Sequence, residues 1–312
     1  MIRFPLFCKI FNFFLFREEI CDIIFKIILL FGGIRVLFLW IAMASLVFSL
    51  IICGCAGGFV TTAWAWMLPA GFAGSFLVLT LLAFLFLLYL CSRVDQDVPQ
   101  EQDDPLYRKV ATLYIRSVLP VLRIRIRVKG EEKLPADGRF MLVCNHVSLS
   151  DPIVLLYAFP KRQLAFISKR ENRDMFVIGP MMHKLQCQLI NRENDREALK
   201  TILRCIQILK EDKASIGVFP EGGINEDLKF HHFRPGVFKI AQKTKVPVVV
   251  CTLKGTKNVI PNMAKLKRSN VQVSVLTVVQ PEEYEGVTTV ELANRIHKIM
   301  ADDLGPDEVA ED

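Results

Sequence analysis

Residues 140–152 read FMLVCNHVSLSDP, and this stretch indicates how the second half of the chain folds. The apolar run Phe140–Cys144 is typical of a short buried strand, and Pro152 suits the first turn of a following helix. His146 and Asp151 lie between the two, and five residues on one helix amount to about 500° of rotation, so they would not share a face. We therefore expect a loop that folds back, with Asp151 at the helix N-cap and within hydrogen-bonding reach of His146.

Strands and helices are expected to alternate on both sides of this stretch, because apolar runs typical of strands alternate with runs of helical periodicity. The alternation predicts an α/β domain with a mixed, mostly parallel sheet flanked by helices. The other expected strands are Leu122–Lys129, Gln163–Ile167, Ser215–Phe219, Val246–Thr252 and Val271–Val279, and the expected helices are Pro152–Phe159, Asp195–Lys210, Pro235–Lys243 and Val290–Met300.

The strand expected at Leu122–Lys129 alternates between apolar and basic residues, which gives it one basic face. Such a face is exposed to water or meets a membrane surface, and the sequence leaves both open. The net charge of +7 suits anionic headgroups or phosphorylated substrates. Nucleic acid is not expected as a partner, because basic and acidic residues are mixed and no nucleic-acid motif occurs. The basic face comprises Arg123, Arg125, Arg127 and Lys129.

An uncharged stretch precedes this domain. From Val36 to Ser92 there is no Asp, Glu, Lys or Arg, although 23% of all residues are charged. About 20 apolar residues of helix cross the roughly 30 Å core of a bilayer, so the stretch is long enough for two crossings. We expect an N-terminal transmembrane helical hairpin, Val36–Gly57 and Gly71–Cys91. Phe59–Ala70, with two Trp residues and Pro69, is expected to form the interfacial turn.

The flanks of the hairpin predict its orientation. Arg35 and Arg93 place both of its ends, and the α/β domain, on the cytoplasmic side. The nine cysteines have no paired spacing and indicate a reducing compartment. The expected parts are an interfacial amphipathic segment at 1–35, a two-helix transmembrane region at 36–92, the α/β domain at 93–304 and an acidic disordered tail at 305–312.

Three motifs place polar groups after expected strands. Glu221, in the run FPEGG at residues 219–223, lies where α/β sheets form ligand sites, or else in an ordinary turn. Arg192 follows a short apolar strand and is suited to grip a phosphate through two hydrogen bonds, or else is solvated. His146 is a general base whose tautomer Asp151 determines, or else a turn residue.

The order and spacing of these motifs resembles the glycerolipid acyltransferase family (PlsC-like), which includes the 1-acylglycerol-3-phosphate acyltransferases. The resemblance covers roughly residues 105–285. The chain departs from the family at Gln186, where Gly is usual, at Leu189, where Phe is usual, and at 223–225, where Thr-Arg-Ser is common. The matching segments are Asn145–Asp151, Ile167–Lys169, Leu189–Arg192, Phe219–Gly222, Phe233–Gly236 and Val246–Val250.

The resemblance implies an enzyme that moves a fatty acyl group from a thioester, on coenzyme A or acyl carrier protein, to the sn-2 hydroxyl of lysophosphatidic acid. The product would be phosphatidic acid, in phospholipid biosynthesis. His146 would be the base and Asp151 would orient it, with no acyl-enzyme, no metal and no cofactor besides the thioester co-substrate. The favoured location is a bacterial plasma membrane. The implied substrate-binding residues are Asn145, Lys169, Arg192, Glu221 and Gly222.

Four alternatives remain at this point. One is an acyltransferase for another lysolipid, and another is a membrane adaptor that keeps the fold without catalysis. A third is a hydrolase whose nucleophile is among the residues flanking His146, although no Gly-x-Ser-x-Gly motif occurs. A fourth is a metal centre at His231, His232 and Glu221, which is disfavoured because adjacent side chains on a strand or helix point apart. The candidate nucleophiles are Cys144, Ser148 and Ser150.

Overall fold

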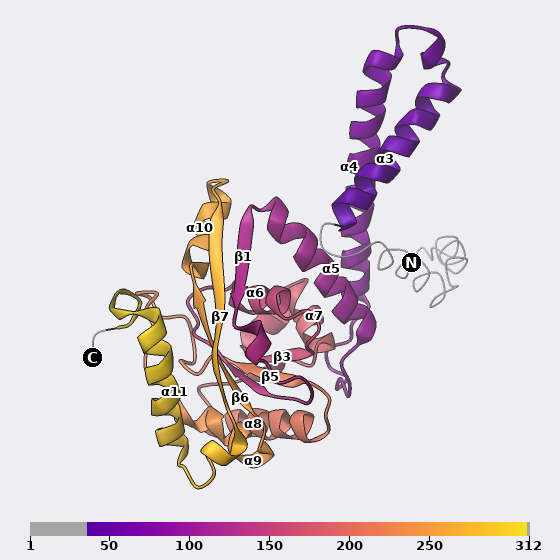
Figure 1. The fold of residues 1–312 in the computed structure, drawn as a ribbon. Helices are drawn as coiled ribbons and strands as arrows, with labels where there is room; N and C mark the ends of the chain where they lie inside the picture. Colours follow the sequence, from indigo (N-terminus) through magenta and orange to yellow (C-terminus); the bar gives the residue numbers. More distant parts are fainter. Residues whose placement is uncertain (1–35, 311–312) are drawn as a thin grey trace. The chain divides into compact units, whose positions relative to one another are not determined.

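The structure is a computed structural model that describes residues 36–310, in two compact units that meet at Phe76 and Leu77. The first unit holds helix α3 (Val36–Cys55), the 3-10 turn η1 (Gly58–Val60) and the start of helix α4 (Trp64–Ser92). Both helices are long and apolar enough to cross a membrane, so the predicted hairpin is present (Figure 1). Ser49 donates a hydrogen bond from Oγ to the carbonyl of Leu68 at 2.6 Å, which joins the two helices.

The connection between the two helices is shorter than predicted. Trp64 already begins α4, so most of the expected turn at Phe59–Ala70 is helical and Pro69 lies inside the helix. A proline in the second turn of a helix removes the hydrogen bond to the carbonyl four residues earlier and crowds that carbonyl, and this apolar helix of 29 residues accommodates both effects. The interfacial segment predicted at residues 1–35 lies outside the described residues.

The second unit contains a seven-stranded sheet of order β1-β7-β6-β2-β5-β3-β4 (Figure 1). Neighbouring strands are parallel except β6 and β7, which are antiparallel. The predicted mixed, mostly parallel sheet is therefore confirmed. The strands are β1 (Ile124–Lys129), β2 (Met141–Val143), β3 (Leu164–Lys169), β4 (Gln188–Ile190), β5 (Ser215–Val218), β6 (Val248–Lys254) and β7 (Ser269–Val279).

Helices cover both faces of this sheet, because successive residues of a buried strand point to opposite faces. Met141 packs with α8, α9 and α11 in one core cluster, and Leu142 packs with α5, α6 and α10 in the other. The helices are α5 (Pro105–Val121), α6 (Asp151–Ala158), α7 (Ile178–Lys184), α8 (Asp195–Lys210), α9 (Lys239–Thr244), α10 (Val259–Ala264) and α11 (Thr289–Leu304), with 3-10 turns η2 (Glu131–Lys133), η3 (Arg170–Asp174), η4 (Pro235–Phe238), η5 (Thr256–Asn258), η6 (Pro281–Glu283) and η7 (Pro306–Glu308).

The segment after Gly305 is ordered up to residue 310, and the prediction of a disordered tail was wrong there. Val309 forms a bridge with Phe230 and packs against the core. Lys257 forms an ion pair with Glu308 at 2.7 Å. Its acidic composition suggested disorder, but one apolar residue and one ion pair hold the segment to the domain.

Candidate active site

The candidate site lies at one edge of the sheet. The parallel strands β2 to β6 all end at this edge, and ligand sites of α/β sheets form there. His146 follows β2, Arg192 follows β4 and Glu221 follows β5, so the three motifs found in the sequence share one edge. Lys169 ends β3 directly opposite Ile190 of β4, which brings this cation close to the same place.

His146 and Asp151 are in direct contact. Nδ1 of His146 lies 2.9 Å from Oδ2 of Asp151. The same Oδ2 accepts the backbone amides of Val147 at 2.9 Å and Ser148 at 2.8 Å. Asp151 is the first residue of α6 and Ser150 is the N-cap, so the predicted N-cap role of Asp151 was wrong. The carboxylate faces the loop before the helix because those amides are its donors.

This arrangement leaves one imidazole nitrogen available for chemistry. Asp151 is fully buried and accepts Nδ1–H, so Nε2 of His146 carries the lone pair. The His146 ring stacks on Phe219 with centroids 4.2 Å apart, which holds the ring plane. The His146 side chain keeps an exposed fraction of 15%, so a substrate hydroxyl can reach Nε2. The pair therefore has the geometry of a general base with an oriented tautomer.

Glu221 forms hydrogen bonds to both loops of the site. Its Oε1 accepts the backbone amide of His146 at 2.7 Å, and its Oε2 accepts that of His231 at 3.0 Å. Burial raises the pKa of Glu221 from its ordinary value of 4.5 to about 8, although both amides lower it. Glu221 thus positions the backbone of His146 rather than touching its ring.

This pKa predicts a pH-dependent stability. Because the folded state holds the Glu221 proton between pH 4.5 and about 8 and the unfolded chain does not, stability falls as pH rises through that window, by roughly 3–5 kcal/mol. Glu221→Gln should remove this pH dependence. It should also lower the free energy of unfolding by about 1–3 kcal/mol, because the NH2 group of Gln would face one of the two backbone amides. Thermal unfolding in detergent from pH 5 to 8 tests both expectations. Glu226→Gln, at an exposed neighbour, should keep the wild-type slope.

Two arginines converge beside the glycines that follow Glu221. A Cβ at Gly222 would lie 2.6 Å from Nε of Arg234, and one at Gly223 would lie 3.2 Å from Nη1 of Arg192. Gly222 also has a φ of 86°, which only glycine adopts easily. Burial, and then the nearby Arg234, lower the pKa of Arg192. Within residues 36–310 neither guanidinium forms an ion pair, so an anion would satisfy both.

Asn145 has a different role from the one predicted. Its side chain is buried, donates to the carbonyl of Leu253 at 3.0 Å and accepts the amide of Leu253 at 2.7 Å. The NH2 group and the carbonyl oxygen of this side chain are thus both bonded to β6, so Asn145 does not face a substrate. It anchors the start of the His146 loop to the neighbouring strand.

The alternative chemistries fit this geometry poorly. Cys144 is fully buried on β2's continuation, and burial raises the pKa of its thiol well above its ordinary value, so it is not a nucleophile. Oγ of Ser148 pairs with that of Ser150, and neither contacts His146. Nε2 of His231 contacts Asp227 instead of sharing a site with Glu221. Among the described residues, no cluster of three or more His, Cys, Asp or Glu could hold a metal ion.

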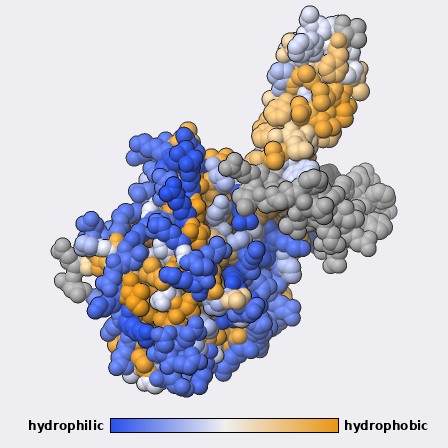
Figure 2. Space-filling view, in the orientation of Figure 1, coloured by the Kyte–Doolittle hydropathy of each residue, from blue (hydrophilic) through white to orange (hydrophobic). Residues whose placement is uncertain are grey.

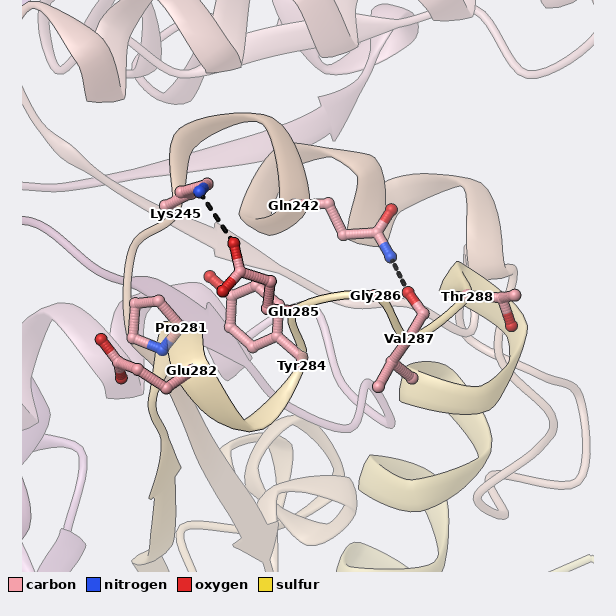
Figure 3. Close-up of a pocket in the computed structure, with 9 residues that line it drawn as sticks. All are labelled: Gln242, Lys245, Pro281, Glu282, Tyr284, Glu285, Gly286, Val287 and Thr288. Carbon is pink, nitrogen blue, oxygen red and sulfur yellow. Dashed lines mark hydrogen bonds and ion pairs between the residues drawn. The ribbon is translucent and has the colours of Figure 1, made fainter.

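A hollow elsewhere on the domain is unrelated to this site. It follows α9 and β7, at the opposite edge of the sheet from His146 (Figure 3). Lys245 pairs with Glu285 at 3.0 Å and Gln242 donates to the carbonyl of Val287 at 2.6 Å, so these three side chains are already engaged.

Comparison with known proteins places the chain in a class. Residues 125–254 match the family model described as Acyltransferase, and this match spans the His146, Arg192 and Glu221 motifs. The chain therefore contains an acyltransferase domain.

Individual relatives narrow this class. A probable 1-acyl-sn-glycerol-3-phosphate acyltransferase of Mycoplasma pneumoniae is 25% identical over 235 residues, which cover 70% of this chain and 87% of the relative. A chloroplastic 1-acyl-sn-glycerol-3-phosphate acyltransferase of Arabidopsis thaliana is 33% identical over 180 residues, covering 55% and 49%. The crystal structure of the 1-acyl-sn-glycerophosphate acyltransferase PlsC of Thermotoga maritima matches with a TM-score of 0.55 and 25% identity, covering 70% and 86%. The chain is similar to these glycerolipid acyltransferases, over most of the length of the Mycoplasma and Thermotoga proteins.

Proposed function

We propose that the protein transfers a fatty acyl group from a thioester to the sn-2 hydroxyl of lysophosphatidic acid and so forms phosphatidic acid for phospholipid biosynthesis. The observation that carries this proposal is a base with an oriented tautomer, His146 on Asp151, at the same sheet edge as Arg192 and Arg234, which form no ion pair within residues 36–310. The names of the relatives specify this acceptor, which supports the choice.

In this mechanism Nε2 of His146 takes the proton of the acceptor hydroxyl as its oxygen attacks the thioester carbonyl. The imidazolium that forms is stabilised by the Asp151 carboxylate, whose position the amides of Val147 and Ser148 maintain. Collapse of the tetrahedral intermediate breaks the C–S bond, and the imidazolium returns its proton to the leaving thiolate. No covalent acyl-enzyme is formed, because the thioester is attacked by the acceptor itself.

The acceptor phosphate is assigned to Arg192 and Arg234, with Lys169 as a third cation at the same edge. Gly222 and Gly223 leave the space that these guanidinium groups occupy. This chain has Ile224 where the family commonly carries an arginine after Pro-Glu-Gly-Thr, so Arg192 and Arg234 are the guanidinium groups beside these glycines.

An acceptor panel tests this assignment. We expect transfer to lysophosphatidic acid and none to monoacylglycerol, which lacks the phosphate. Arg192→Ala and Arg234→Ala should each raise KM for lysophosphatidic acid about 10- to 100-fold, as expected for a lost charge-assisted hydrogen bond. Arg196→Ala, an exposed arginine on α8, is the matched control. Equal use of both acceptors, or unchanged KM in both variants, would refute the phosphate site.

The donor is proposed to be a thioester of coenzyme A or of acyl carrier protein, and the same assay run with each donor separates them. We place the protein in a membrane through α3 and α4, with the catalytic domain on the cytoplasmic face and a bacterial plasma membrane favoured. The basic residues that flank the hairpin support this orientation.

A further inference from the structure

The distribution of charge on the second unit is uneven in a way that the catalytic site does not explain. Residues 105–130 and 251–281 contain twelve Lys and Arg and no Asp or Glu. The whole chain has a net charge of +7 and these two segments carry +12, so all the other residues together carry a net charge of −5. The two segments are also neighbours in space, because β1 pairs with β7 and Arg123 accepts the amide of Ser269 through its carbonyl at 3.2 Å.

At one end of this basic region lies a small apolar tip. Ile260, Met263 and Leu266 are exposed, and Leu266 is the most exposed with a fraction of 77%. Arg123 donates from Nη1 to the carbonyl of Leu266 at 3.0 Å, which binds the tip to the start of β1. Figure 2 shows strongly hydrophilic surface over α10 and the start of β7, next to this tip. The exposed cations around it are Arg123, Arg125, Lys265, Lys267 and Arg268.

These cations are available to a partner. Lys254 and Lys257, at the base of the region, are already paired with Asp303 and Glu308. The five cations around the tip form no ion pair within residues 36–310. An apolar tip surrounded by unpaired cations has the composition of a segment that enters the interface of an anionic bilayer. A soluble acidic partner would need the charges but not the exposed Ile260, Met263 and Leu266.

The tip is joined through Arg123 to the end of α5, which packs along α4. Tyr107 and Tyr114 of α5 donate hydrogen bonds to the carbonyls of Leu90, at 2.9 Å, and Ala83, at 2.5 Å, so α5 runs antiparallel to α4. From Tyr114, α5 continues seven residues to Val121, about 10 Å further. Helix α5 therefore runs back toward the N-terminal end of α4, and its last turn and Arg123 lie on that side of Tyr114.

We propose that the α10–β7 tip is a second membrane contact, in which Ile260, Met263 and Leu266 enter the interfacial layer and the surrounding cations bind anionic headgroups. This contact would orient the domain, since β6 ends and β7 begins at the same sheet edge as His146. The hairpin tethers the chain, and the tip directs the catalytic edge toward the lipid. The inference rests on the membrane placement of α4 and not on the identity of the acceptor.

Depth-dependent quenching tests the contact directly. Full-length Leu266→Trp is reconstituted into vesicles of equal parts zwitterionic and anionic lipid, brominated near the headgroup end of the acyl chain. The fluorescence added by this Trp, above that of the three native Trp residues, should be quenched. Val290→Trp is the matched control: Val290 has an exposed fraction of 52% at the start of α11, at the opposite sheet edge, and should not be quenched.

Charge reversal then tests the cations. In the Leu266→Trp background, Lys265→Glu, Lys267→Glu and Arg268→Glu together should lower the ratio of quenched to unquenched Trp at least about fivefold, since each surface cation contributes about that factor. Lys239→Glu with Lys243→Glu, exposed cations on α9, should leave the ratio unchanged. No quenching of Leu266→Trp, or its shielding by acyl carrier protein instead of anionic lipid, would overturn the proposal. Both readouts are independent of acyl transfer, so they stand apart from a failure of the proposed reaction.

Discussion

Replacing His146 with alanine is expected to lower the rate of acyl transfer about 10²- to 10⁴-fold, the usual contribution of a positioned general base. The fold should survive, because Asp151 keeps the amides of Val147 and Ser148 as donors and only the 2.9 Å contact to the imidazole is lost. The Phe219 ring loses its stacking partner, which should change stability little. The measurement is kcat with lysophosphatidic acid and a labelled acyl thioester, together with thermal unfolding.

Cys144→Ala is the matched control for this experiment. Cys144 lies two residues from His146, but its side chain is fully buried and its thiol makes only a weak hydrogen bond, to Oδ1 of Asn145 at 3.8 Å. We therefore expect near wild-type kcat, with a small loss of stability from the cavity. Full activity in His146→Ala would show that the base has been misassigned. Loss of activity in Cys144→Ala, with an acylated peptide trapped, would favour a covalent route instead.

Much of the domain could be predicted from local sequence patterns. Helix α8 has the predicted bounds, Asp195–Lys210, because its apolar positions recur at helical spacing and Asn194 accepts the amides of its first turn. The alternation in β1 was also confirmed, since Ile124 is buried while Arg125 and Arg127 are exposed. Both signals are local and strongly periodic, so they need no tertiary information.

Other elements carried no such signal. Helices α7 and α10 have seven and six residues, too few to show a helical period. The order of the strands depends on pairings between distant residues, such as β1 with β7, that no local pattern encodes. The family usually has glycine at position 186. Gln186 adopts a φ of 61° there, a backbone conformation in which glycine is less strained, and this explains the preference.

The candidate site was predicted in its chemistry but not in all its contacts. The residues that follow strands were identifiable, because the carboxyl ends of parallel strands share one edge. Arg234 was not predicted as a site residue, because it follows no strand and only the tertiary structure brings it next to Gly222. Asn145 was assigned to substrate as part of the motif that resembles the family, whereas its amide completes hydrogen bonds with Leu253. Adjacency in sequence therefore indicated which loop matters, but not the direction of each side chain.

Asp151→Asn should separate the charge of this residue from its role as a scaffold. The Asn carbonyl can replace Oδ2 and still accept from Val147, Ser148 and Nδ1 of His146, so the loop and the tautomer should persist. The NH2 group then takes the place of Oδ1, which is buried without a partner in the described part of the chain, and leaving its donors unsatisfied should cost about 1–3 kcal/mol.

The catalytic effect of the same change should be larger than its effect on stability. The imidazolium that forms in the transition state loses its buried counter-charge, so we expect kcat to fall roughly 10²- to 10³-fold while KM for lysophosphatidic acid stays constant. Asp151→Ala is the comparison: it also removes the acceptor of both loop amides, so its unfolding temperature should drop well below that of Asp151→Asn. Equal stability of the two variants would mean that the amides do not depend on this carboxylate. A wild-type kcat in Asp151→Asn would mean that orientation alone, without charge, is what His146 requires from its partner.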